Sequence, residues 1–149
     1  MPEPTLRRLP WYLAYLSMLK NRQVEYVSTT RMAEELDVDP SQIAKDLSFL
    51  GIKGKTRIGY EVNVLERHLH DFLGFGTRHN ALMVGVGSLG AALIADSGLQ
   101  RYGLNIVAGI DVDPNLIGTS ICGVEIFAPD KVPQLVESLG IKIGVLAVP

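Results

Sequence analysis

The chain has 149 residues, of which 47% are hydrophobic and 20% are charged, and its formal net charge at pH 7 is −2. These values exclude an intrinsically disordered chain and a protein that coats nucleic acid through bulk positive charge. The sequence has no apolar run long enough to span a bilayer and no signal-peptide pattern at its N-terminus. We therefore expect a globular cytoplasmic protein with no membrane partner.

Two helices are predicted in the first 36 residues. Leucines recur at spacings of three and four from Leu9 to Leu19, the pattern of an amphipathic helix. Residues 27–30 include Ser28 and offer capping side chains to a short second helix over residues 31–36. Asp37 and Val38 then form a turn.

A third helix is predicted over residues 40–50. Asp39 is a suitable N-cap, Pro40 suits the first helical position, and Gln42 occupies the capping-box position. Its apolar stripe leaves four polar side chains toward solvent, namely Ser41, Gln42, Lys45 and Ser48. The arrangement predicts a helix-turn-helix.

A basic wing is predicted after Gly51. Residues 52–53 and 58–62 can pair as a hairpin whose tip holds Lys55, Thr56 and Arg57. Asn63 is the expected cap of a fourth helix, over residues 63–72, and the glycine-rich residues 74–77 end the pattern. These elements predict a winged-helix DNA-binding domain over residues 1–77.

Residues 78–149 alternate between strand and helix patterns. Strands are predicted over residues 81–86, 105–111, 124–127 and 141–148, and helices over residues 88–101 and 130–139. The predicted fold class is α/β with an N-terminal winged helix: a winged helix-turn-helix domain followed by a Rossmann-type NAD(P)-binding domain. Only about half of such a sheet is present, so we expect a truncated Rossmann domain and a fragment of a longer protein.

A G-x-G-x-x-G motif follows the first of these strands. Glycine permits the tight turn, the approach of a pyrophosphate and close helix packing, and Asp111 follows 21 positions after Gly90 (111 − 90). Asp111 is expected to accept the ribose hydroxyls and to favour NAD(H) over its 2′-phosphorylated form. Asp113-Pro114 is interpreted as a turn, with Asp113 as a second binding acid as the alternative. The candidate cofactor-binding residues are Gly85, Val86, Gly87, Ser88, Leu89, Gly90, Asp111 and Val112.

Candidate DNA contacts come from the polar face of the third helix, the wing and the N-terminus. Gln42 is suited to adenine, and Lys45 to guanine or phosphate. The alternatives are an ordinary solvated helix face and, for Arg8, a solvated N-terminus. The full set is Arg8, Ser41, Gln42, Lys45, Ser48, Lys53, Lys55, Arg57 and Tyr60.

Catalytic and metal-binding patterns are missing from the sequence. His68 and His70 lie two apart on a predicted helix and so face different directions, and no nucleophile or proton-relay group follows the glycine motif. Cys122 is read as a small buried hydrophobic residue, with a reactive thiol as the alternative.

Taken together, these motifs resemble those of the redox-sensing transcriptional repressor family Rex. The matching segments are Arg8-Leu9-Pro10, Ser41-Gln42, Lys45-Asp46-Leu47-Ser48, Gly59-Tyr60, residues 84–90, Asp111-Val112-Asp113-Pro114 and Ile117-Gly118. The resemblance implies a homodimer that binds palindromic double-stranded operator DNA and leaves it when NADH displaces NAD⁺. Ala44 replaces an arginine usual in the family, and Thr56-Arg57 stands where Arg-Gly is common. The family's second sheet half and its C-terminal dimerisation helix are expected beyond Pro149.

Two other functions are compatible with the motifs alone. One is a fragment of an NAD-dependent oxidoreductase, although no substrate-side acid or base is identifiable. The other is a transcription regulator that senses a different nucleotide-containing ligand, such as coenzyme A or an adenylate.

Overall fold

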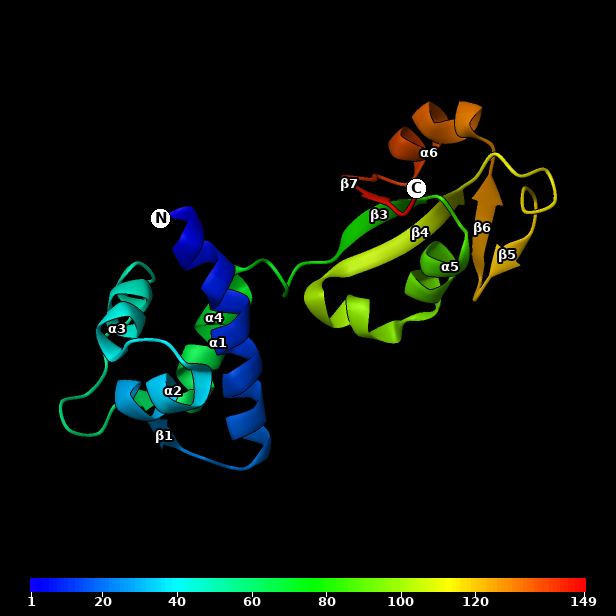
Figure 1. Ribbon diagram of the computed structural model, residues 1–149. Helices are drawn as coiled ribbons and strands as arrows, with labels where there is room; N and C mark the ends of the chain where they lie inside the picture. Colours follow the sequence, from blue (N-terminus) through cyan, green and yellow to red (C-terminus); the bar gives the residue numbers. More distant parts are fainter. The chain divides into compact units, whose positions relative to one another are not determined.

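The computed structural model describes the backbone of residues 1–149 and every side chain except that of Ser97. It divides into two compact units, residues 1–74 and residues 75–149 (Figure 1). No helix in the described part of the chain has both the length and the apolar character needed to cross a membrane.

The first unit contains four helices and a two-stranded sheet. Its elements are α1 (Glu3–Asn21), β1 (Tyr26–Val27), α2 (Thr29–Leu36), α3 (Pro40–Ser48), β2 (Tyr60–Glu61) and α4 (Val62–Phe72). Its fully buried side chains include Leu9, Tyr12, Leu16, Leu19, Met32, Ile43, Leu47, Leu65 and Leu69. Helix α1 packs on α4, and α2 packs on α3.

Helix α1 begins six residues before the predicted start. The buried positions of its first turns include Thr5, which is only 2% exposed, in line with Leu9 and Tyr12. Because Thr5 is polar, the first turns of the helix lack the apolar repeat that predicts an amphipathic helix. The extra turns place Thr5 and Arg8 on the helix that packs in this unit.

Side-chain caps start α2 and α3 as predicted. Ser28 Oγ accepts from Arg31 N at 3.1 Å, and Asp39 Oδ1 accepts from Ser41 N at 2.8 Å. Helix α3 ends at Ser48, two residues early. The capping-box role of Gln42 is wrong, because its side-chain amide donates to Asp46.

The wing differs from the predicted hairpin. Strand β2 pairs antiparallel with β1, not with residues 52–53, and the wing is a turn closed by a bridge between Lys55 and Gly59. A Cβ on Gly59 would lie 2.3 Å from Val27 O, so glycine is required where the wing meets β1. The two-residue β1 is too short to show a periodicity.

Helix α4 also starts differently from the prediction. Asn63 lies inside the helix, and the N-cap is Glu61, which makes no side-chain capping bond. Val62, at the start of α4, is fully buried. Packing of that first turn therefore stands in for a capping side chain.

The second unit is a five-stranded sheet with helices on both faces. Its elements are β3 (His79–Val84), α5 (Ser88–Ala95), η1 (Ser97–Tyr102), β4 (Leu104–Ile110), β5 (Ser120–Ile121), β6 (Val124–Phe127), η2 (Pro129–Lys131), α6 (Val132–Ser138) and β7 (Ile143–Leu146). The strand order is β5-β6-β4-β3-β7, with all neighbours parallel except β5 and β6.

Successive side chains of β3 point to opposite faces of this sheet. Leu82 joins a cluster with Leu135 of α6, and Met83 joins one with Ile94 of α5. Helices α5 and α6 accordingly cover opposite faces (Figure 1). The predicted helix over residues 88–101 is broken at Asp96, whose Oδ1 accepts from Gly98 N at 2.7 Å and starts η1.

Candidate functional site

The glycine motif lies where the order of the parallel strands reverses. From β3 the chain continues to β4 and β6 on one side and then returns to β7 on the other. In open α/β sheets, ligands bind outside the carboxyl ends of the strands at such a switch point. Residues 85–90 follow directly after β3, and Ala147 N bonds to Val84 O at 2.8 Å beside them.

Two of the three motif glycines are required by close backbone contacts. A Cβ on Gly85 would lie 2.7 Å from Ala147 O, and one on Gly90 would lie 2.0 Å from Gly85 O. A Cβ on Gly87 would meet nothing within 4 Å, so this glycine leaves open space at the N-terminus of α5. Gly85 and Gly90 are therefore needed by the fold, whereas the space at Gly87 is free for a ligand.

Asp111 bonds to the glycine loop. Its Oδ2 accepts from Val86 N at 2.8 Å, and its Oδ1 accepts from Asp113 N at 2.9 Å. These backbone hydrogen bonds, from Asp113 and then from Val86, lower the pKa of Asp111. The side chain is therefore a fixed anion at neutral pH, half-buried beside the loop.

An apolar cavity of about 250 Å³ adjoins Asp111 at the carboxyl ends of β3 and β4. Its lining includes Leu82, Val84, Ile110, Pro129 and Val132. Such a surface accommodates the faces of a flat base, while Asp111 at its rim suits ribose hydroxyls. These residues fit the adenosine half of a dinucleotide.

The other predicted cofactor residues lie in the glycine loop or beside the cavity. Val86 is buried and Gly87, Ser88 and Leu89 are exposed. Ser88 is the first residue of α5, where free backbone N–H groups suit a pyrophosphate. Val112 is 80% exposed at the mouth of the cavity. The predicted turn at Asp113 is confirmed, because its Oδ1 accepts from Asn115 N.

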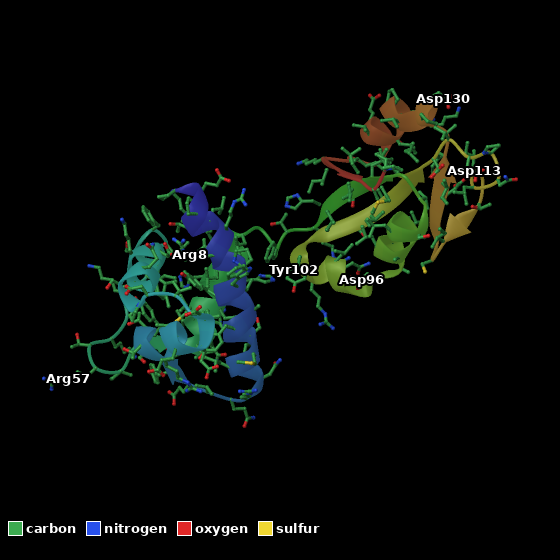
Figure 2. All side chains as sticks on the ribbon, viewed as in Figure 1. Arg8, Arg57, Asp96, Tyr102, Asp113 and Asp130 are labelled. Carbon is green, nitrogen blue, oxygen red and sulfur yellow. The ribbon has the colours of Figure 1, made fainter. Side chains whose placement is uncertain are left out.

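Six of the nine predicted DNA residues are exposed, and the other three are half-buried or buried. Ser41, Lys45 and Ser48 are exposed on α3, and Lys53 and Arg57 are exposed on the wing. Figure 2 shows Arg57 at the outer tip of the wing. These side chains form a polar and largely basic face suited to phosphates and base edges.

Two wing residues, Lys55 and Tyr60, contact other residues of the same unit. Lys55 Nζ donates to Tyr26 Oη at 3.2 Å and lies 5.1 Å from the centre of that ring. Tyr60 is buried, and a Cβ on Gly54 would lie 3.1 Å from its ring. Tyr60 therefore supports the wing from beneath.

Arg8 and Gln42 both bind a carboxylate that the sequence reading did not single out. Arg8 Nε lies 2.7 Å from Asp46 Oδ2, Arg8 Nη2 lies 2.9 Å from Asp46 Oδ1, and Gln42 Nε2 donates to Oδ1 at 2.8 Å. Figure 2 labels Arg8 on α1. The expectation of four solvent-facing side chains on α3 is therefore wrong for the half-buried Gln42.

Asp46 itself is fully buried. Burial alone would raise its pKa, but hydrogen bonds from Arg8, Tyr12, Thr5 and Gln42 outweigh that effect and lower the pKa to about 2. Burial and the bond to Asp46 raise the pKa of Tyr12 above its ordinary value. Asp46 lies three residues after the apolar Ile43, which places the two residues on the same face of a helix. This spacing was the sequence signal for an acid that faces the core.

Cys122 does not occupy a core position. It is exposed, with φ +47°, in the turn between β5 and β6. The predicted burial of this residue is wrong, because a tight turn of two residues joins these strands. Within the described residues, no three His, Cys, Asp or Glu side chains are grouped to hold a metal ion.

Known proteins match both units. Residues 1–48 match the family described as "Putative DNA-binding protein N-terminus", and residues 77–149 match "CoA binding domain". A redox-sensing transcriptional repressor Rex from Bacteroides fragilis is 53% identical over 149 residues, covering 100% of this chain and 68% of the relative. The chain belongs to the Rex family.

Solved structures agree with this membership and with the predicted fold class. A Rex-family repressor called RSP, in complex with β-NAD⁺ and operator DNA, has a TM-score of 0.95 at 32% identity over 100% of this chain and 69% of RSP. RSP in complex with β-NADH has a TM-score of 0.91 at 31% identity. The Rex resemblance and the winged-helix and Rossmann architecture predicted from the sequence are thereby confirmed.

Proposed function

We propose that this protein is a redox-sensing transcriptional repressor that binds operator DNA and is released when NADH replaces NAD⁺. The observation that carries the proposal is the match, over the whole chain, to a repressor crystallised with NAD⁺ and operator DNA and also with NADH. The relatives are named as repressors and not as enzymes. This protein would act in the cytoplasm, where it would meet both operator DNA and NAD(H).

NAD(H) would bind across residues 85–90 and the cavity beside Asp111. The exposed N-terminus of α5 offers N–H groups and the positive end of a helix dipole to the pyrophosphate. Asp111, Val112 and the cavity would hold the adenosine, and the anionic Asp111 would repel a 2′-phosphate. Gly85, Val86 and Gly90 shape the loop, and Gly87, Ser88 and Leu89 line its open side.

Operator DNA would bind the exposed face of α3 and the wing. Lys45, Ser41 and Ser48 would enter the major groove with Gln42, and Lys53 and Arg57 would contact phosphates. Lys55 and Tyr60 would act mainly by supporting the wing, since both contact residues within the unit. Arg8 would retain at most one free guanidinium nitrogen for phosphate, because Nε and Nη2 bind Asp46.

A homodimer would read the two halves of a palindrome. NADH would act by binding more tightly than NAD⁺ to a domain arrangement in which the two copies of α3 no longer match the half-sites, about 34–36 Å apart. A ligand shifts an equilibrium only by its differential affinity, so a hundredfold preference supplies about 2.7 kcal/mol.

Coenzyme A is the alternative ligand favoured by a specific observation, namely the family description matched by residues 77–149. Coenzyme A carries a phosphate on its adenosine ribose, which the Asp111 anion disfavours. Titration of NADH, NAD⁺ and coenzyme A in parallel tests the choice. The proposal expects NADH to bind most tightly; tighter binding of coenzyme A would overturn it.

A further inference from the structure

A buried carboxylate on α3 belongs to neither the proposed dinucleotide site nor the exposed face proposed to contact DNA. Asp46 of α3 is fully buried, yet its carboxylate accepts hydrogen bonds from four side chains. Three of the donors belong to α1: Thr5 Oγ1 at 2.9 Å, Tyr12 Oη at 2.7 Å, and Arg8 through Nε at 2.7 Å and Nη2 at 2.9 Å. The fourth is Gln42 Nε2 on α3 itself, at 2.8 Å.

This cluster fixes α3 on α1 in one orientation. A buried carboxylate is costly to desolvate, and each donor satisfies part of its acceptor capacity. The bonds are directional, whereas the apolar contacts of Ile43 and Leu47 on the same helix are not. Rotation or sliding of α3 would therefore separate a buried charge from its three donors on α1.

The cluster also determines which way the Gln42 amide points. An ionised carboxylate only accepts hydrogen bonds, so the nitrogen of Gln42 must face Asp46 and Oε1 must face away. A free glutamine exchanges these two ends by rotating its amide. Asp46 removes that freedom.

We propose that Asp46 is a positioning residue for operator recognition, which orients α3 and presents Gln42 Oε1 to the major groove as an acceptor. The proposal rests on the proposed operator binding. Adenine and cytosine offer an exocyclic amino donor in the major groove, whereas guanine and thymine offer acceptors. Gln42 is thus expected to favour a base with an amino group. Adenine should be favoured above all, because the second N–H of the Gln42 amide remains available to donate to adenine N7.

The test uses two matched variants of α1. Tyr12→Phe removes one hydroxyl that donates to Asp46. Tyr15→Phe makes the same chemical change three residues away, at a buried tyrosine that is not a donor to Asp46. Asp46→Asn and Gln42→Ala complete the set. If Asp46→Asn does not fold, the tyrosine pair still decides the question.

The first measurement is hydrogen exchange of the Gln42 side-chain amide by NMR, which needs no DNA. Wild type and Tyr15→Phe should show slow exchange, Tyr12→Phe faster exchange, and Asp46→Asn the fastest. Equal exchange in wild type, Tyr12→Phe and Asp46→Asn would overturn the positioning role, whatever the protein does with DNA.

For the second measurement, wild type first selects a preferred DNA duplex from a random pool. Copies of this duplex are then made with a substitution at each base pair, and the ratio of the affinities for the selected and the substituted duplex is measured. Gln42→Ala should reduce discrimination at one position by about tenfold. Asp46→Asn should reduce it at the same position, and the double variant should add little to either. Additive losses would overturn the proposal. If wild type selects no sequence, operator recognition itself fails, and the NMR result still decides whether Asp46 orients Gln42.

Discussion

Asp111 Oδ2 accepts a hydrogen bond from the backbone N–H of Val86 at 2.8 Å. The proposed ribose acceptor, at the end of β4, is thus joined to the proposed pyrophosphate loop, at the end of β3. Both parts of the cofactor site are held in register by one carboxylate. A ligand that meets this site finds the loop already shaped, which lowers the entropic cost of binding.

Replacement of Asp111 by asparagine should weaken NADH binding about 10- to 100-fold, because an amide cannot accept from both Val86 and Asp113 and has no charge to share with ribose. Discrimination against NADPH should also fall. Calorimetry with both nucleotides measures these effects. Asp130→Asn is the control, since it neutralises an exposed acid on η2 (Figure 2). Unchanged selectivity in Asp111→Asn would argue against the ribose role.

Alanine at Gly87 and at Gly90 should have different consequences. Gly87→Ala should leave the melting temperature near that of wild type but weaken NADH binding about tenfold, because its Cβ enters open space where the pyrophosphate is expected. Gly90→Ala should lower the free energy of unfolding by about 1–3 kcal/mol, because its Cβ would overlap Gly85 O. Thermal melts and NADH titrations of both variants separate the two effects. Equal NADH affinity in Gly87→Ala and wild type would contradict the loop assignment.

Arg57 combines a charge with an unfavourable backbone conformation, φ +65°. Arg57→Gly should raise the free energy of unfolding by about 1 kcal/mol, because glycine adopts this region without strain. Operator affinity should fall, and the slope of log K against log salt should decrease by about 1. Arg57→Lys retains the charge and should keep most of the affinity. The assignment to phosphate fails if Arg57→Gly binds DNA as wild type does at every salt concentration.

Acid should destabilise the first unit through Asp46. Its pKa of about 2 in the folded chain lies below the ordinary value of 3.8, so the carboxylate contributes stability above pH 4. That contribution, about 2 kcal/mol, is lost as the pH falls from about 4 to 2. Asp46→Asn should flatten this part of the profile of unfolding free energy against pH. Parallel profiles for wild type and Asp46→Asn would show that another group is responsible.

The sequence predicted best where local chemistry alone determines the structure. The caps at Ser28 and Asp39 depend on residues two or three positions away, and both were predictable. Strand β6 was predicted with its exact bounds because it is a short apolar run between turns. The glycine motif and Asp111 were recognisable because their spacing reflects one βαβ unit.

Long-range contacts were not predictable in the same way. The pairing of β1 with β2 joins residues more than thirty positions apart, and neither strand is long enough to show alternation. Three of the four donors to Asp46 lie 34 to 41 positions away on α1, so its burial left only a weak trace in the sequence. The role of Arg8 changed for that reason, because its partner became visible only in the folded chain. Gln42, in contrast, lies four residues before Asp46 on the same helix, a spacing at which side chains are neighbours.

The most direct test of redox sensing is the stability of the complex between the intact protein and a labelled palindromic operator at a fixed total concentration of NAD⁺ plus NADH. Fluorescence anisotropy measured while the ratio of NADH to NAD⁺ rises reports the fraction of DNA bound. We expect release of the operator as NADH replaces NAD⁺. Constant occupancy at every ratio would contradict it.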